Sequence, residues 1–291
     1  PRVENGRVYG RGSCDMKAGL AAYLEVVRRL QAGGETLSGD LIIAGVVDEE
    51  HAMLGSKAFG ETGPPVDFAI IAEPSELAIC PVHKGQMMFG LRTRGVSVHS
   101  SLPDKGVNAI FHMGRILRAL EDHAAELAAR PAHPMCGSPT LSVGVVGGGT
   151  NASSVPDWAR IEVDRRTIPG ENHEAVQAEL EAVVESVRAD VPGLDYSFDH
   201  HDLNVPPLET PEDAATVRAL LAASEACLGT ASPVRSFSGS TDAPNFGCEA
   251  VICGPGALAQ CHSLDEYVSI EQLEQAVDIY HRAVLQLMRG D

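Results

Sequence analysis

Short apolar runs, each followed closely by an acidic or imidazole side chain, indicate the fold class of this sequence. Residues 41–47 and 68–72 are almost continuously apolar, as strands are when helices cover both faces of their sheet. Glu49 and Glu50 follow the first run, and Glu73 follows the second. In an open α/β sheet, ligands bind beyond the carboxyl ends of the strands, so these side chains are expected to meet at one site.

Two further groups extend the pattern. Asp15 follows the segment from Val8 to Gly12, and His262 comes one loop after the apolar run at 250–253. Three bare carboxylates at one point would raise one another's pKa steeply, because like charges repel. A divalent metal ion would remove this repulsion, so the sequence predicts a metal site where these groups meet.

Composition limits the partners of the protein. The 291 residues are 44% hydrophobic, which suffices for one large domain or two smaller ones. The formal net charge of -18 disfavours nucleic acid and anionic membrane as partners, because both are negatively charged. No apolar run approaches the length of a membrane span. No signal peptide is visible, although the sequence starts as if it were cut.

The seven cysteines favour a cytoplasmic location. Their number is odd and their spacing is irregular, so we expect free thiols in a reducing compartment rather than a disulfide framework. Cys14 and Cys261 each flank a candidate metal ligand. Hard carboxylate neighbours and poor spacing favour the oxygen and imidazole groups over these thiols as ligands.

Periodicity divides the sequence into a discontinuous α/β domain and an inserted one. Up to about residue 80 the pattern is strand, helix, strand, helical turn, strand. Residues 86–203 follow the order β-α-β-β-α-β, the split-βαβ or ferredoxin-like arrangement. We therefore predict one domain from residues 1–85 and 204–291 and a second from residues 86–203. The main helices are predicted at 16–30, 108–127, 173–191, 212–226 and 270–288.

Six segments carry a family resemblance. They are 9–19 (YGRGSCDMKAG), 48–50 (DEE), 72–75 (AEPS), 95–103 (GVSVHSSLP), 163–171 (VDRRTIPGE) and 254–267 (GPGALAQCHSLDEY). In this order they resemble the metal motifs and lid-domain segments of the M20 metallopeptidase family. That family includes acetylornithine deacetylase, succinyl-diaminopimelate desuccinylase, aminoacylase and carboxypeptidase G. The resemblance covers essentially the whole sequence. It implies a mixed-sheet zinc-hydrolase catalytic domain, incomplete at its N-terminus, with an inserted ferredoxin-like lid and dimerisation domain.

The resemblance implies a role for each candidate metal residue. Asp15 would bridge two metal ions, usually zinc, although cobalt or manganese could substitute. Glu50 and His262 would complete one metal site, and Glu73 would serve the other. Glu49 would be the general base that takes a proton from the metal-held water. The family often has a cis peptide bond after this aspartate, so we expect one between Asp15 and Met16.

The resemblance also implies substrate contacts. His99, on the lid, would approach the active site of the partner subunit and stabilise the oxyanion. Arg166 would hold a substrate carboxylate, because a guanidinium group matches a carboxylate with two parallel hydrogen bonds. Asn151 and the stretch Gly239-Ser240-Thr241-Asp242 would line the substrate cleft.

Simpler interpretations stay open for each of these groups. Asp15 precedes a predicted helix and could be an ordinary N-cap. Glu49 and Glu50 could be solvated loop acids, and Glu73 could lie in a surface turn before Pro74. In the same way, His262 could be a loop histidine, His99 a histidine of the lid surface, and Arg166 the partner of Asp164 or Glu162 in an ion pair.

One departure from the family pattern concerns the metal site. The pattern begins with a His-x-Asp motif upstream of the Gly-Arg-Gly segment, whereas this sequence begins at Pro1, after that position. As given, one site keeps Asp15, Glu50 and His262, and the other keeps only Asp15 and Glu73. We therefore expect either that the sequence is a fragment or that a preceding segment belongs to the protein.

The predicted function is a cytoplasmic, zinc-dependent amidohydrolase that acts as a homodimer through its lid domain. It would cleave the amide bond of an N-acyl amino acid, as deacetylases and desuccinylases do. A carboxypeptidase or dipeptidase acting on a short peptide would use the same chemistry. The alternative from another class is a catalytically dead fragment or pseudoenzyme that retains the dimerising scaffold.

Overall fold

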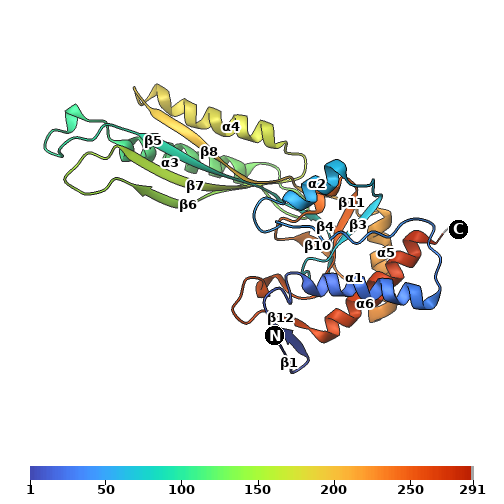
Figure 1. The fold of residues 1–291 in the computed structure, drawn as a ribbon. Coiled ribbons are helices and arrows are strands. Elements are labelled where there is room, and N and C mark those ends of the chain that lie inside the picture. Colours follow the sequence, from blue (N-terminus) through green and yellow to red (C-terminus); the bar gives the residue numbers. More distant parts are fainter. Residues whose placement is uncertain (290–291) are drawn as a thin grey trace. The chain divides into compact units, whose positions relative to one another are not determined.

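A computed structural model describes residues 1–289 of the chain, apart from the side chains of His200 and Asp202. Residues 290 and 291, with which the predicted catalytic domain ends, lie outside the described residues. The chain forms two compact units, and the second is a continuous insertion in the first (Figure 1). The first unit comprises Pro1–His83 and Leu208–Asp291, and the second comprises Lys84–Pro207.

The larger sheet of the first unit is mixed, in agreement with the predicted α/β class. Its strands are β3 (Phe68–Ile71), β4 (Ile79–His83), β9 (Leu208–Glu209), β10 (Val234–Phe237) and β11 (Glu249–Ile252). The order is β10-β4-β11-β3, and β9 pairs with β4. β11 runs parallel to β3 and β10 runs parallel to β4, whereas β11 and β4 are antiparallel.

Three long helices of the first unit share one apolar core. They are α1 (Lys17–Gly33), α5 (Ala215–Leu228) and α6 (Ile270–Met288). On α1 the buried residues Ala18, Ala22, Val26 and Leu30 recur every four positions, which places them on one face of the helix. The C-cap of this helix is Gly34, whose φ of 65° is a backbone conformation that glycine adopts without steric cost. The short helix α2 (Leu54–Thr62) lies apart from this core.

A small sheet joins the start of the chain to its C-terminal part. β1 (Arg2–Glu4), β2 (Arg7–Tyr9) and β12 (Tyr267–Ser269) pair in the order β1-β2-β12. The loop that carries Asp15 leaves β2, and the loop that carries His262 enters β12. The expectation that all candidate metal residues follow strands of one sheet is therefore wrong. Pairing of β2 with β12 instead brings these two loops together.

The predicted strand at 41–47 is also wrong. Residues 41–46 have no regular structure, and among residues 1–289 no strand pairs with them. Leu41, Ile42 and Val47 are exposed. An apolar run becomes a strand only where a neighbouring strand supplies the ladder of hydrogen bonds. The described residues supply no such neighbour here.

The second unit has the predicted order β-α-β-β-α-β. Its elements are β5 (Gly85–Arg94), α3 (Ala109–Ala129), β6 (Thr140–Gly148), β7 (Trp158–Thr167), α4 (His173–Ser186) and β8 (Asp195–Val205). All neighbours in the sheet order β6-β7-β5-β8 are antiparallel. Both helices bury their apolar faces against the sheet in a single core. On β7, Ile161 and Val163 are buried and alternate with the more exposed Glu162 and Asp164, as in a strand with one face on the core.

Residues 1–289 also contain four short 3-10 helices. They are η1 (Pro103–Lys105), η2 (Val187–Ala189), η3 (Ala243–Phe246) and η4 (Leu258–Gln260). None of the helices within the described residues combines the length and the apolar character that crossing a membrane would require.

Candidate metal centre

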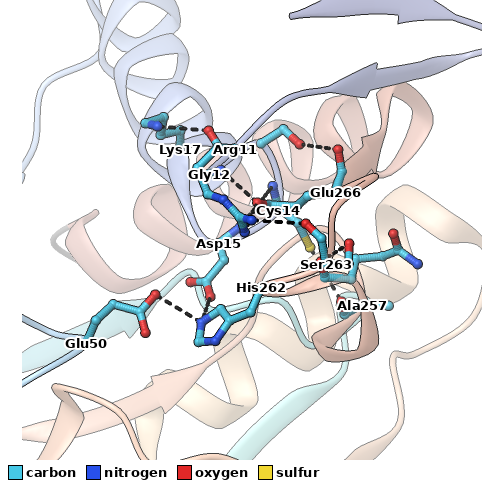
Figure 2. Close-up of polar contacts among 12 residues, drawn as sticks. Arg11, Gly12, Cys14, Asp15, Lys17, Glu50, Ala257, His262, Ser263 and Glu266 are labelled. Atoms are coloured by element: carbon cyan, nitrogen blue, oxygen red, sulfur yellow. Dashed lines mark hydrogen bonds and ion pairs between the residues drawn. The ribbon is translucent and has the colours of Figure 1, made fainter.

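Three side chains from distant parts of the chain converge in the first unit. One ligand atom each of Asp15, Glu50 and His262 lies within 4.8 Å of the other two. His262 Nε2 is 3.2 Å from Asp15 Oδ2 and 3.0 Å from Glu50 Oε1 (Figure 2). Ligand atoms about 2.0–2.1 Å from a tetrahedral zinc ion lie about 3.3 Å from one another. The spacing and the donor types of these three groups therefore fit a zinc ion, and no thiol joins them within the described residues.

Asp15 lies in the loop that connects β2 to α1. Its side chain does not cap the helix, because the N-cap residue is Met16 and no side chain makes a capping hydrogen bond there. The interpretation of Asp15 as an ordinary N-cap is therefore wrong. The peptide bond between Asp15 and Met16 is cis, as predicted. The backbone N–H groups of Cys14 and Asp15 both donate to the carboxylate of Glu266.

A tight turn positions the paired glutamates. Asp48 has a φ of 70°. Its carbonyl oxygen accepts hydrogen bonds from the N–H groups of His51, Ala52 and Met53, and its Oδ2 also accepts one from Ala52 at 3.2 Å. This turn replaces the alternating geometry of a strand, in which neighbouring side chains point to opposite faces. Both glutamates that follow Asp48 can therefore act at one site.

The two glutamates differ in environment. The side chain of Glu50 is 63% exposed and contacts His262. Glu49 is half-buried, and burial raises its pKa to about 8, with further contributions from the negative charges of Asp242, Glu50 and Asp15. Glu49 is not one of the three clustered donors. It is therefore an acid beside the centre that can hold or release a proton.

Glu73 is buried close to the same acids. It comes two residues after β3 and is only 8% exposed, so the interpretation as a surface turn is wrong. Burial raises its pKa well above the usual value, and the charges of Glu49, Asp15 and Asp242 raise it further. Within the described residues no ion pair compensates this carboxylate. A cation at the acid cluster would supply the missing counter-charge, which is a second observation in favour of a metal centre.

Asp242, which the sequence placed in the expected cleft lining, is also a member of the acid cluster. It is buried, and burial raises its pKa, although a hydrogen bond from Ser56 Oγ partly lowers it. Asn245 Nδ2 donates to the same Ser56 Oγ at 2.9 Å. These contacts tie α2, which begins just after the paired glutamates, to η3. The sequence signal was only that Asp242 closes the expected cleft-lining stretch.

Gly239 and Thr241 lie in the segment between β10 and η3. Thr241 is fully buried; its Oγ1 is 3.2 Å from His83 Nε2 and accepts a hydrogen bond from Ala243 N at 3.1 Å. Gly239 is half-buried beside the ring of Phe237. Their assignment to the substrate cleft stays a prediction.

The remaining predicted site residues belong to the second unit. His99 is exposed, with its Nδ1 2.8 Å from Ser101 Oγ. Asn151 Oδ1 accepts hydrogen bonds from the backbone N–H of Ser153 at 3.0 Å and from its hydroxyl at 2.9 Å. Arg166 forms the ion pair that the simpler interpretation named, with its Nε 2.7 Å from Asp164 Oδ1. Their roles towards a substrate stay predictions.

This chain is a two-unit α/β protein with a candidate metal centre. Its class is defined by the mixed sheet, by the inserted β-α-β-β-α-β unit and by the cluster of acids with one histidine. Comparison with known proteins narrows this class. The chain belongs to peptidase family M20/M25/M40, whose family model matches residues 1–286. It is therefore a hydrolase of that family.

Individual relatives differ in their described activities. The chain is 33% identical to an acetylornithine deacetylase from Myxococcus xanthus, over 99% of this chain and 74% of the relative. Its fold is similar to the aminopeptidase PepT from Bacillus cereus, with a TM-score of 0.77 and 20% identity over 99% of this chain and 76% of the other. The di-peptidase Dug1p from Saccharomyces cerevisiae has a TM-score of 0.72 and 15% identity, over 97% and 72%. The two solved structures support the fold alone.

Proposed function

We propose that this protein is a zinc-dependent amidohydrolase that cleaves the amide bond of an N-acyl amino acid. The observation that carries the proposal is the cluster of Asp15, Glu50 and His262 with Glu49 beside it. The cluster offers three protein donors, and an adjacent acid can move a proton. This combination suits hydrolysis by activated water.

The metal would be held by residues of the first unit. Asp15, Glu50 and His262 would hold one ion, and Asp15 with Glu73 would serve a second ion. Cobalt or manganese could replace zinc. A bound dication lowers the pKa of a water molecule and polarises the scissile carbonyl group.

Glu49 would perform the proton transfers. Its half-buried position among other acids raises its pKa to about 8, closer to neutral pH than that of an ordinary carboxyl group, which suits a group that both accepts and returns a proton. It would take the proton of the attacking water and then give it to the departing amine, because a base of matched pKa within hydrogen-bond reach can do both. Hydrolysis of a peptide bond and hydrolysis of an N-acyl bond require the same proton transfers from this residue.

Residues from the lid would complete the site. His99 of a partner subunit would stabilise the oxyanion, and Arg166 would exchange its contact with Asp164 for the carboxylate of the substrate. Asn151, Gly239 and Thr241 would shape the cleft. A homodimer through the second unit supplies His99 in this proposal, and the cytoplasmic location rests on the cysteine pattern.

We favour deacylation over peptide hydrolysis because of the sequence identities to known proteins. The Myxococcus protein described as an acetylornithine deacetylase is 33% identical to this chain. The peptidases among the similar solved structures are only 15–21% identical. Glutamate rather than aspartate at position 73 also resembles the deacylase and carboxypeptidase branch of the family.

The proposal is tested on purified protein that has been stripped of metal and then reloaded with Zn²⁺, Co²⁺ or Mn²⁺. Amine release is followed with N-acetyl amino acids, N-succinyl amino acids and dipeptides, and the intact mass and metal content are measured on the same sample. Metal-dependent hydrolysis of an N-acyl amino acid is expected. Preference for dipeptides would overturn the substrate class. Metal-loaded protein that hydrolyses none of these compounds would favour the scaffold alternative.

A further inference from the structure

Glu266 occupies an unusual position beside the candidate metal centre. Its side chain is only 2% exposed, and its two carboxylate oxygens accept four hydrogen bonds from one loop (Figure 2). Oε1 accepts from the N–H groups of Cys14 at 2.9 Å and Asp15 at 3.0 Å. Oε2 accepts from the N–H of Gly12 at 2.9 Å and from Arg11 Nη1 at 3.0 Å.

These contacts occupy the whole carboxylate. An ionised carboxylate offers about four acceptor positions, and each oxygen of Glu266 here receives two donors. Hydrogen bonds to a charged acceptor are stronger than neutral ones, so the backbone of residues 12–15 is held firmly. Because its oxygens face N–H donors, Glu266 is not itself one of the clustered metal donors.

The same residue also lies on the loop of His262. Its backbone oxygen accepts hydrogen bonds from Gly10 N at 3.0 Å and Ser13 Oγ at 3.3 Å. The backbone oxygen of Ser263 accepts one from Arg11 Nη2 at 3.1 Å. The segment 263–266 and the segment 10–15 are therefore cross-linked through both backbone and side-chain atoms.

We propose that Glu266 is a positioning residue that sets the separation of Asp15 and His262. The inference rests on the proposed function, in which these two residues are metal ligands. With the carboxylate in place, Asp15 is fixed through its own N–H and that of Cys14, while His262 lies four residues away on the chain that carries the carboxylate. Loss of the carboxylate would release the N–H groups of residues 12–15 and leave the contacts to the backbone oxygens of Ser263 and Glu266 to join the two loops.

Replacement of Glu266 by glutamine removes the positioning role of the carboxylate and hardly changes the shape of the side chain. The amide keeps one acceptor oxygen but turns its NH₂ group towards two N–H donors, which leaves those donors without partners. Ser224→Ala is the matched control in the same unit. It removes the buried hydroxyl that accepts a hydrogen bond from Ser232 N at 2.9 Å, so it also orphans a backbone N–H. It touches none of the acids.

The first readout uses metal-free protein. Amide hydrogen exchange across residues 10–16 should be faster in Glu266→Gln than in wild type and unchanged in Ser224→Ala. The second readout is the dissociation constant for Zn²⁺ measured by competition with a chelator. It should rise about 10- to 100-fold in Glu266→Gln, as is usual when a partner that orients a ligand is lost. It should stay at the wild-type value in Ser224→Ala.

The outcomes separate this inference from the proposed function. Wild-type exchange and wild-type Zn²⁺ affinity in Glu266→Gln would overturn the inference. Failure of the wild-type protein to bind Zn²⁺ would overturn the metal centre, while the exchange experiment would still report on the loop. If Glu266→Gln does not fold, Glu266→Asp replaces it. Its shorter side chain cannot reach all four donors, so faster exchange and weaker binding are expected there too.

Discussion

Individual side chains at the centre owe their properties to their surroundings rather than to their type. Glu49 and Glu50 are chemically alike and adjacent in sequence. Glu50 is exposed and touches His262, whereas Glu49 is half-buried among other acids and has its pKa raised to about 8. The turn at Asp48 directs the chain out of the extended conformation, so both glutamates lie at one site although their exposure differs.

The difference between the two glutamates leads to a prediction for Glu49→Gln. Turnover should fall by about 10²- to 10⁴-fold, because the amide is nearly the same shape but cannot accept the proton of water. Zinc content should stay at the wild-type level, because Glu49 is outside the three-donor cluster. Rate and metal content are measured on the same preparation.

A matched control for this substitution lies on the next helix. Glu61→Gln makes the same chemical change at an exposed position of α2 and should leave turnover unaltered. Activity retained in Glu49→Gln would refute the assigned role. Loss of metal together with turnover would make Glu49 a ligand.

At the scale of elements, each helix or strand forms where neighbouring residues supply its hydrogen bonds and packing contacts. The run at 41–47 has the composition of a strand but pairs with none among the described residues. In the second unit, α4 begins at His173 directly after its N-cap Asn172, whose side chain accepts from Ala175 N. His173 Nε2 is 2.8 Å from Thr167 Oγ1, and its Nδ1 contacts Asn204 Oδ1, so one ring connects α4 to the ends of β7 and β8.

This ring predicts a pH-dependent stability. Burial lowers the pKa of His173 below its usual value of 6.5, nearby Arg165 lowers it further, and Asn204 and Glu171 only partly oppose this. Between the folded and the unfolded pKa the unfolded chain therefore binds more protons. The stability contribution of neutral His173 is complete above the unfolded pKa and is lost as the pH falls towards the folded pKa.

The measurement is the free energy of unfolding by urea from about pH 7.5 down to about pH 5. His173→Gln keeps polar atoms but cannot titrate, so its stability should fall less steeply with decreasing pH than that of wild type. His281→Gln on α6 serves as the control and should keep the wild-type slope. Equal slopes for wild type and His173→Gln would contradict the prediction.

At the scale of the whole molecule, the second unit offers a surface for a second copy. β6 lies at the edge of its sheet (Figure 1), and an edge strand carries backbone groups that can pair with another chain. Val145 and Val146 on this strand are exposed, as is Phe111 near the start of α3. Ile110, next to Phe111, contacts the end of β6 at Gly148. These apolar groups support the proposed homodimer, since burying them would offset the repulsion of two acidic chains.

Substitution on this surface should separate the subunits. Val146→Asp combined with Phe111→Asp is expected to give the monomer mass of 30.7 kDa by light scattering, while Val3→Asp on β1 should keep the wild-type mass. Activity is expected to fall when the dimer dissociates, because His99 would act in the partner's site.

Mixing the inactive variants Glu49→Gln and His99→Ala should restore activity in hybrid dimers. Absence of recovery in proven hybrids would place His99 outside the partner's site.

Local sequence determined a large part of this protein. Helical spacing of apolar residues predicted α1, α3 and α6, and the order of elements in the second unit was confirmed, because these patterns reflect local backbone geometry. The motifs around Asp15, Glu49 and His262 indicated the family, which the comparison confirmed. The assigned roles of the site residues stay predictions.

Only the tertiary structure decided how the parts of the site are held. The sequence placed Asp15 after the segment from Val8 to Gly12, and it is the pairing of β2 with β12 that puts Asp15 beside the loop of His262. Neither the four hydrogen bonds to Glu266 nor the contact of Asp242 with Ser56 follows from local pattern. Both join residues more than 180 positions apart, and such contacts depend on the packing of the whole unit rather than on any single segment.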